Sequence, residues 1–270
     1  MPKIEVGEIE MGYDLSGPED GERVVLIRGL GGPKEAWREQ AEPLSDEFRI
    51  LVFDNRGIGD SSKPDHRYTI PMFASDLSGL MAAIGWDSAH IIGGSMGGMI
   101  AQEFALGFPY KVKSLTLLYT TPGGRNQAPP RPEVLDHWSN QEGLTEEEIA
   151  RKGIELGFSK RFRDANPDRM EELIAQSIKE APSPQTFMHH LEAAMRHDAS
   201  SRLHFLDMPV LIAHGTDDWL LPHQNGERLA ELIRGARLEL FEGAGHALGV
   251  EYQDEFNALL RSWIRENAGR

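Results

Sequence analysis

The chain has 270 residues, enough for one large domain with its own core or for one domain that carries an insertion. Its formal net charge of −15 and its pI near 5.1 argue against the basic surface that nucleic acids and anionic membranes attract. It has no cysteine, which excludes disulfide bonds, thiolate metal sites and a cysteine nucleophile.

The start of the chain carries no targeting signal that can be read from its composition. Its first ten residues lack the apolar core of a signal peptide. No run approaches the roughly 20 apolar residues that a membrane helix needs. We therefore expect a cytoplasmic protein, monomer or homo-oligomer, with a small-molecule substrate and with neither a membrane nor a nucleic acid as partner.

Short apolar runs alternate with longer helical patterns over most of the chain. Continuous apolar runs that are each followed by a helix indicate a parallel sheet covered on both faces. In the first part we expect strands at residues 24–27, 50–53, 90–92 and 114–119, and helices at 35–44, 71–84 and 97–108. The pattern resumes late, with strands at 209–213 and 238–241 and helices at 222–233 and 252–266.

The composition changes between these two parts. Thr145 and Glu148 have the spacing of a capping box, in which the two side chains satisfy backbone amides at a helix start. Two apolar stripes with helical spacing follow, at residues 170–178 and 187–195. We therefore expect residues 1–121 and 207–270 to form the core and residues 122–206 to form a helical cap insertion over the end of the sheet.

Residues 92–98 read Ile-Gly-Gly-Ser-Met-Gly-Gly, a Gly-x-Ser-x-Gly match between a predicted strand and a predicted helix. That context is what a nucleophile elbow requires. Ser95 would lie at the tip of a sharp turn in a strained backbone conformation, where only small neighbours such as Gly93 and Gly97 avoid a clash. The alternative is a glycine-rich turn with an incidental serine, because the motif by itself is common.

A serine hydroxyl needs an adjacent base, and that base needs a group that orients it. Candidates occur in the chain order serine, acid, histidine. Asp217 and Asp218 follow the predicted strand at 209–213, which places a carboxylate at the carboxyl edge of the sheet. His246 follows the strand at 238–241 in a loop of small residues that can reach back across the sheet.

With these motifs the chain resembles the α/β-hydrolase fold superfamily, and within it serine esterases and enol-lactonases. Gly215, Asp218 and Pro222 match the family pattern Gly-x-x-Asp with a proline four residues on, which selects Asp218 over Asp217. Residues 243–246 match its Gly-x-Gly-His loop. Residues 54–61 match its Asp-x-Arg-Gly-x-Gly-x-Ser signature, which we interpret as a turn that holds its own loop together.

The resemblance covers essentially the whole chain. It implies the α/β-hydrolase fold, with a mostly parallel central sheet, helices on both faces and a helical cap. It also implies that Ser95 is the nucleophile, His246 the base and Asp218 the orienting acid. The oxyanion hole, which needs two backbone amides, would be formed by Met96 and Leu30. No metal or organic cofactor is needed for this chemistry.

One departure from the family pattern concerns Arg28. Family members usually have His-Gly where this chain has Arg28-Gly29. Two interpretations compete: a structural salt bridge on an acidic protein, or an anchor for an anionic substrate. Arg28, Trp138, Trp219 and Leu248 are candidates for the walls of a substrate pocket, although each could equally serve packing.

Two cofactor interpretations are weaker. Glycines from Gly29 onward resemble part of a dinucleotide fingerprint, but Lys34 occupies the place of its third glycine. His189, His190 and His197 lie in the expected cap without a cysteine or a Glu-x-x-His pattern, so we expect no metal site.

We therefore expect a hydrolase that cleaves a carboxylic ester or lactone of a small, partly apolar substrate through an acyl-enzyme. Haloalkane dehalogenases and soluble epoxide hydrolases of the fold that this chain resembles carry aspartate at the elbow, so Ser95 argues against both. One alternative is a carbon–carbon bond hydrolase of ring-cleavage products. The other is a non-catalytic protein of this fold that binds a small ligand, against which the complete set of Ser95, Asp218 and His246 argues.

Overall fold

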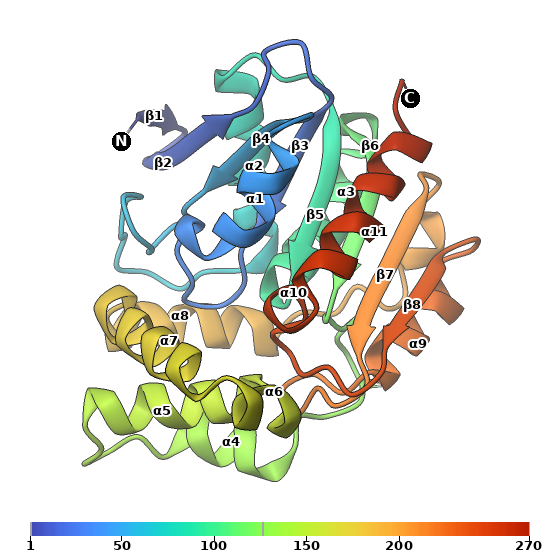
Figure 1. The fold of residues 1–270 in the computed structure, drawn as a ribbon. Coiled ribbons are helices and arrows are strands. Elements are labelled where there is room, and N and C mark those ends of the chain that lie inside the picture. The colour runs from blue at the N-terminus through green and yellow to red at the C-terminus, as the bar shows by residue number, and fades with distance from the viewer. Residues whose placement is uncertain (1, 126, 270) are drawn as a thin grey trace.

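The computed structural model describes residues 2–125 and 127–269, and their strands form one eight-stranded sheet. Its order is β1-β2-β4-β3-β5-β6-β7-β8. β1 and β2 pair antiparallel, as do β2 and β4, and all further neighbours are parallel, as predicted for a mostly parallel sheet. The strands are β1 (Lys3–Val6), β2 (Ile9–Ser16), β3 (Arg23–Ile27), β4 (Arg49–Phe53), β5 (Ala89–Gly94), β6 (Val112–Leu118), β7 (Val210–Gly215) and β8 (Arg237–Phe241) (Figure 1).

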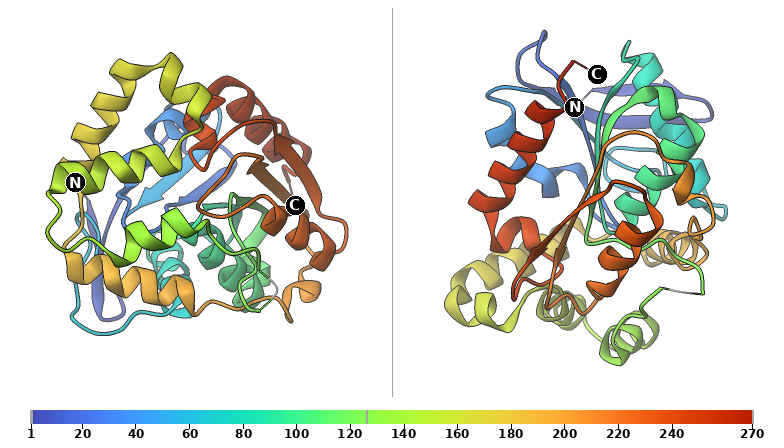
Figure 2. Two further views of the ribbon diagram at one scale, coloured as in Figure 1. Left: turned by 90° about the horizontal axis from the view of Figure 1, so that it is seen from below. Right: turned by 90° about the vertical axis from the view of Figure 1, so that its right-hand side faces the viewer.

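Helices cover both faces of the sheet, as the right-hand view of Figure 2 shows. One face packs against α2 (Ile70–Ala83), α3 (Met96–Gly107) and α9 (Gln224–Leu232). The other packs against α1 (Arg38–Leu44), α10 (Leu248–Glu251) and α11 (Gln253–Glu266). Three short 3-10 helices complete this part: η1 (Lys34–Trp37), η2 (Pro109–Lys111) and η3 (Leu203–Phe205).

The central strand β3 explains why the apolar runs were continuous rather than alternating. Val25 and Ile27 belong to the hydrophobic cluster on the α2 and α3 side. Val24 and Leu26 belong to the cluster on the α1 and α11 side. Because successive side chains of a strand point to opposite faces, a strand buried on both faces needs apolar residues at every position.

Five α-helices, here called the cap helices, lie between β6 and β7 among the described residues: α4 (Pro132–Ser139), α5 (Glu146–Gly157), α6 (Lys160–Ala165), α7 (Pro167–Glu180) and α8 (Pro184–Met195). They gather at the end of the sheet to which the arrows of β5 and β7 point (Figure 1). The capping box predicted at the start of α5 is confirmed, since the Glu148 amide bonds to Thr145 Oγ1 and the Thr145 amide bonds to the Glu148 carboxylate. No helix within residues 2–125 and 127–269 is long and apolar enough to cross a membrane.

The antiparallel edge of the sheet is the main element that the sequence analysis did not predict. β1 and β2 carry exposed glutamates, such as Glu5 and Glu10, between a few buried apolar residues. Their strand structure depends on the pairing of β1 with β2 and of β2 with β4. Such tertiary contacts leave no clear pattern in the local sequence. The predicted helix at 35–44 divides into η1 and α1, whereas the helix predicted at 252–266 is confirmed as α11 and is preceded by the short helix α10, which was not predicted.

Candidate active site

The turn between β5 and α3 has the geometry predicted for the elbow. Ser95 has φ 57° and ψ −124°, and α3 begins at the next residue. A Cβ on Gly93 would lie 2.2 Å from the Gly97 carbonyl oxygen, and a Cβ on Gly97 would lie 2.1 Å from the Ile27 carbonyl oxygen. Both glycines are therefore required for α3 to start this close to the sheet. Residues 89–94 and 96–105 are buried, whereas Ser95 between them is partly exposed.

Asp218 and His246 meet at the carboxyl edge of the sheet, in the loops that follow β7 and β8. Nδ1 of His246 donates to Oδ2 of Asp218 over 2.7 Å. Oδ1 of Asp218 accepts from the Leu220 and Leu221 amides, each over 2.9 Å. Asp217 lies elsewhere, because its Oδ1 accepts from the indole of Trp219. The structure thus places Asp218, and not Asp217, against the histidine.

The environment of Asp218 keeps it ionised. Burial alone would raise the pKa of this carboxyl, but His246 and His214 more than offset that effect and lower the pKa to about 2. His214 contributes because its Nε2 lies 3.3 Å from Oδ2 of Asp218. At neutral pH a buried carboxylate therefore accepts the Nδ1 proton of His246. The other ring nitrogen of His246, Nε2, bonds to none of the described residues, and neither does the Ser95 hydroxyl.

The two loops that carry Asp218 and His246 are joined through their backbones. The Asp217 amide donates to the Ala244 carbonyl over 2.9 Å. The Gly243 amide donates to Oγ1 of Thr216 over 2.7 Å. These bonds fix the histidine loop on the acid loop, so the distance between the two side chains follows from backbone pairing as well as from their own hydrogen bond.

Gly29 lies directly against the elbow. A Cβ on Gly29 would lie 3.0 Å from Cβ of Ser95 and 3.5 Å from the amide nitrogen of Met96. Leu30, the other residue predicted for the oxyanion hole, follows Gly29 in the chain. The Leu30 amide donates no backbone hydrogen bond to a described residue. A hydrogen bond from Asn55 to the Arg28 carbonyl, over 2.9 Å, fixes the start of this loop.

Tyr119, which directly follows β6, was not among the site residues predicted from the sequence. Its ring packs edge-on against His246, with centroids 4.9 Å apart, and its hydroxyl lies over Gly94, where a Cβ would approach it to 2.6 Å. Tyr119 has φ 36°, and within the described residues it shares a positive φ with only one other non-glycine residue, Ser95. A backbone strain of this kind has no signature in the sequence, whereas the position at a strand end could have drawn attention to the residue.

The cap is tied to the histidine loop by Glu251. Oε1 of Glu251 accepts from the amide of Ser159, between α5 and α6, over 2.7 Å and from the amide of Gly245 over 3.1 Å. The Ala247 amide also donates to the Gly157 carbonyl at the end of α5 over 3.0 Å. The position of His246 therefore depends on contacts with cap helices as well as with the core.

His190 of α8 serves as a packing and hydrogen-bonding group. His190 is buried; its Nε2 donates to the Arg56 carbonyl over 2.9 Å, and its Nδ1 accepts from the Gly31 amide over 3.4 Å. Burial lowers the pKa of His190 to about 4, so the ring is neutral and both nitrogens are satisfied. Within residues 2–125 and 127–269 no group of three acidic or histidine side chains is arranged to hold a metal ion.

The four candidate pocket residues have different surroundings. Leu248 is fully buried in the cluster on the α1 and α11 side, so for this residue packing is the observed role. Trp219 is half-buried and stacks under the Arg131 guanidinium, 4.1 Å from its ring centroid. Trp138 is half-buried in α4. Arg28 is half-buried beside the ring of Trp37.

The charged residues of the turn at residues 54–61 form ion pairs with residues outside the turn. Arg56 is buried and binds Asp76 of α2 through two hydrogen bonds of 2.7 Å. Nζ of Lys34, also buried, lies 3.0 Å from Asp54 and 3.1 Å from Asp60. These side chains brace the loop against α2 and η1.

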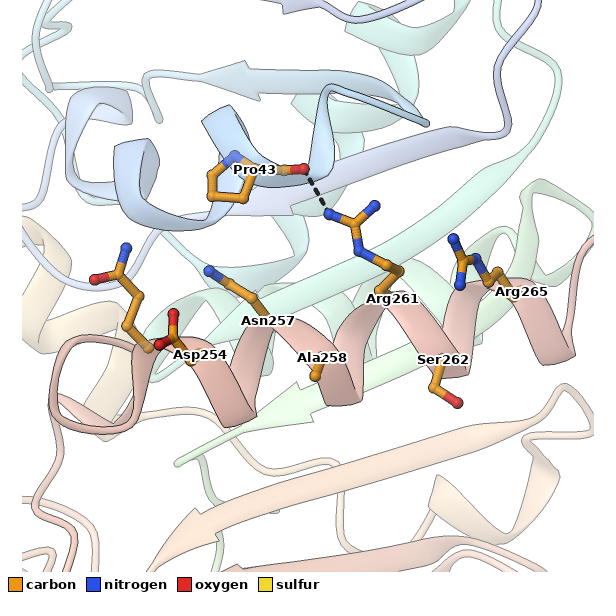
Figure 3. A pocket seen from close by; sticks show the side chains of 8 residues that line it. Pro43, Asp254, Asn257, Ala258, Arg261, Ser262 and Arg265 are labelled. Atoms are coloured by element: carbon orange, nitrogen blue, oxygen red, sulfur yellow. Dashed lines mark hydrogen bonds between the residues drawn. The ribbon is translucent and has the colours of Figure 1, made fainter.

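A separate surface groove runs along α11 and does not include any candidate site residue (Figure 3). Its cationic side chains are neutralised by the protein itself, since Arg261 and Arg265 both bind Glu47, over 2.9 and 2.7 Å. Arg261 also donates to the Pro43 carbonyl. Ser262 in this groove donates to Glu266, and none of the described residues that line the groove is a histidine that could act as its base.

Comparisons with known proteins agree with this fold. Residues 22–251 match the model of the protein family described as alpha/beta hydrolase fold. A putative carbamate hydrolase, RutD, from Azorhizobium caulinodans is 27% identical over 98% of this chain and 99% of its own length. A thermophilic esterase from Thermogutta terrifontis is 27% identical, with a TM-score of 0.85 over 99% of both chains. An enol-lactonase from Burkholderia xenovorans has a TM-score of 0.86 over 98% of this chain and 100% of its own, and at 24% identity it supports the fold alone.

Proposed function

The chain belongs to the alpha/beta hydrolase fold family, and on that premise we propose that it is a serine hydrolase that cleaves a carboxylic ester or lactone of a small substrate. Ser95 is the nucleophile, His246 the general base and acid, and Asp218 the residue that orients the imidazole. The observation that carries this proposal is the hydrogen bond of 2.7 Å from His246 Nδ1 to a buried, ionised Asp218. That bond leaves the lone pair of Nε2 free to accept a proton.

In the proposed reaction, His246 Nε2 takes the proton of the Ser95 hydroxyl while Oγ forms a bond to the carbonyl carbon of the substrate. The amides of Leu30 and Met96 donate to the oxyanion of the tetrahedral intermediate. The carbon–oxygen bond to the leaving group then breaks, and the leaving oxygen takes the proton from Nε2. Water repeats the sequence on the acyl-enzyme and releases the acid. Residues 122–206 would act as a cap that encloses the substrate.

The relatives support a carbonyl substrate. Carbamates and esters both present a carbonyl carbon to a nucleophile, and the proteins named above as carbamate hydrolase and esterase cover nearly the whole chain. The hydrogen bond between His246 and Asp218 also supports catalysis over simple ligand binding. A binding protein gains nothing from an ionised carboxylate that orients a histidine, whereas a general base requires it.

The test is a hydrolysis screen of short and medium acyl esters, lactones and carbamates with the purified protein, Ser95→Ala and Ser262→Ala. Ser262 is exposed in α11 and serves as the control serine. We expect turnover that Ser95→Ala reduces by about 10⁴-fold or more and that Ser262→Ala leaves unchanged. A fluorophosphonate should label the wild type and Ser262→Ala but not Ser95→Ala.

Other outcomes separate the alternatives. Labelling of Ser95 without turnover of any ester, lactone or carbamate would favour a carbon–carbon bond hydrolase, which needs the same nucleophile and base but a different substrate. The absence of both turnover and labelling would contradict the proposal and favour a binding protein of this fold.

A further inference from the structure

The side chain of Arg28 is held by packing contacts and not by an ion pair with a described residue. It directly follows β3 and precedes Gly29, the residue that borders Ser95. Its side chain folds over Gly32, where a Cβ would lie 2.8 Å from Cγ and 2.7 Å from Nε, and its guanidinium carbon lies 5.9 Å from the ring centroid of Trp37. Among residues 2–125 and 127–269 no carboxylate lies within 4.0 Å of Arg28, and its guanidinium donates no hydrogen bond. The salt-bridge interpretation therefore finds no partner in the described chain.

The protein pairs its other cations near this site. Lys34 and Arg56 are both buried, and Lys34 pairs with Asp54 and Asp60 and Arg56 with Asp76 over 2.7–3.1 Å. The chain has 43 acidic residues against 28 basic ones, so carboxylates are abundant. A half-buried guanidinium beside the elbow that none of the described carboxylates satisfies is therefore available to an anion from outside the protein.

Tyr119 offers a second donor at the same edge of the sheet. Its hydroxyl lies over Gly94, next to Ser95, and forms no hydrogen bond to a described residue. The ring packs edge-on against His246, and the backbone holds φ 36°, a left-handed conformation that is strained for a non-glycine residue. Packing of the core alone does not require a hydroxyl at this position, since phenylalanine has the same ring.

We propose that the guanidinium of Arg28 and the hydroxyl of Tyr119 form a subsite for a carboxylate carried by the substrate, so that the preferred ester or lactone is an anion. This inference rests on the proposed function. A guanidinium presents donors in a fork that matches the two oxygens of a carboxylate, and a phenol adds one further donor. Burial raises the pKa of Tyr119 above its ordinary value, while Arg28 opposes the rise, so the hydroxyl keeps its proton at neutral pH and can donate.

The experiment compares monomethyl adipate with methyl hexanoate, two methyl esters of equal acyl length that differ in one carboxylate. The ratio of their kcat/KM values is measured for the wild type, Arg28→Gln, Arg28→Lys and Tyr119→Phe. The control is Arg23→Gln, because Arg23 stands at the opposite end of β3 and also lies over a tryptophan, 5.6 Å from the ring of Trp86. We expect the ratio to fall at least tenfold in Arg28→Gln, less in Arg28→Lys and about threefold in Tyr119→Phe, and to stay unchanged in Arg23→Gln. An equal ratio in the wild type and Arg28→Gln would overturn the inference.

Failure of the proposed function is distinguishable from failure of this inference. If neither ester is hydrolysed in a Ser95-dependent manner, the proposed function fails, and the subsite is then tested by calorimetric titration of adipate into the wild type and Arg28→Gln. Binding of adipate that weakens at least tenfold in Arg28→Gln would support the subsite, and equal or absent binding would overturn it. Thermal unfolding of each variant shows that it is folded, and Arg28→Lys retains the charge if Arg28→Gln does not fold.

Discussion

Glu251 joins Ser159 of the cap to the loop that carries His246. Its carboxylate accepts from the Ser159 amide over 2.7 Å and from the Ser159 hydroxyl over 2.5 Å, while the same Oε1 accepts from the Gly245 amide over 3.1 Å. One side chain of α10 therefore satisfies backbone amides on both sides of the boundary between cap and core. The cap and the histidine loop are coupled through it.

We predict that Glu251→Ala displaces the histidine loop. Because the amides of Ser159 and Gly245 lose their acceptor, the free energy of unfolding should fall by about 1–3 kcal/mol. Because His246 is no longer held against the site, kcat should fall about 10- to 100-fold. Urea unfolding and ester hydrolysis measure the two effects. Glu255→Ala, an exposed glutamate of α11, is the control, and an equal effect of both variants would contradict the prediction.

A second prediction concerns the pH dependence contributed by Asp218. Its pKa in the folded protein is about 2, below the ordinary value of 3.8. The stability that this carboxylate contributes is thus present above about pH 4 and is lost as the pH falls through 2, and it amounts to roughly 2 kcal/mol. In Asp218→Asn that contribution is absent. The difference in unfolding free energy between the wild type and Asp218→Asn, measured by urea at pH 6, 4, 3 and 2.5, should therefore shrink over this window.

Asp218→Asn should also lower kcat by about 10⁴-fold, because an amide no longer holds the Nδ1–H tautomer of His246. Steady-state hydrolysis of a neutral ester at pH 7 measures this. Asp217→Asn is the matched control, since its side chain contacts Trp219 rather than His246. Comparable losses of kcat in the two variants would contradict the proposed role of Asp218.

A third prediction follows from the contact between Gly29 and Ser95. In Gly29→Ala the new methyl group would lie 3.0 Å from both Cβ of Ser95 and the Gly94 carbonyl oxygen. Since that is closer than a normal contact, the loop with the Leu30 amide must move away from the elbow, and kcat/KM should fall about 10- to 100-fold. The unfolding free energy should fall by about 1–2 kcal/mol.

Gly107→Ala is the control for this substitution. Gly107 is the last residue of α3, the helix that begins directly after Ser95. A Cβ at this position would have no atom within 4 Å. Its replacement should leave activity unchanged and stability equal or slightly higher, because alanine favours the helix. Full activity of Gly29→Ala would show that the loop position does not matter for the reaction.

A fourth prediction tests the structural interpretation of the turn at residues 54–61. Asp76→Ala leaves the buried guanidinium of Arg56 without its partner, and this should cost about 3–5 kcal/mol of unfolding free energy. Glu42→Ala removes an exposed partner of Arg38 and should change stability by less than about 1 kcal/mol. Urea unfolding compares the two. A small effect of Asp76→Ala would mean that Arg56 finds other partners and that the turn does not depend on this pair.

The sequence alone predicted the parallel part of the sheet and its flanking helices. Strands such as β3 and β5 are buried on both faces, so their continuous apolar runs stand out locally. The elbow was predictable because its Gly-x-Ser-x-Gly motif lies between an apolar strand pattern and a helix pattern, although the conflict that requires Gly97 is with Ile27 of β3. The edge strands β1 and β2 were not, since their identity depends on partners elsewhere in the chain.

Local chemistry in the sequence thus determined the fold class and identified Ser95, Asp218 and His246 as candidates, because turns, strand ends and motif spacing are properties of neighbouring residues. Only the tertiary structure decided that Asp218 rather than Asp217 faces His246, and that Leu248 belongs to the core. It alone placed Tyr119 between His246 and Gly94 and left Arg28 without a carboxylate among the described residues. These relationships join residues that are distant in the chain, and they are set by how the sheet, the loops and the cap pack together.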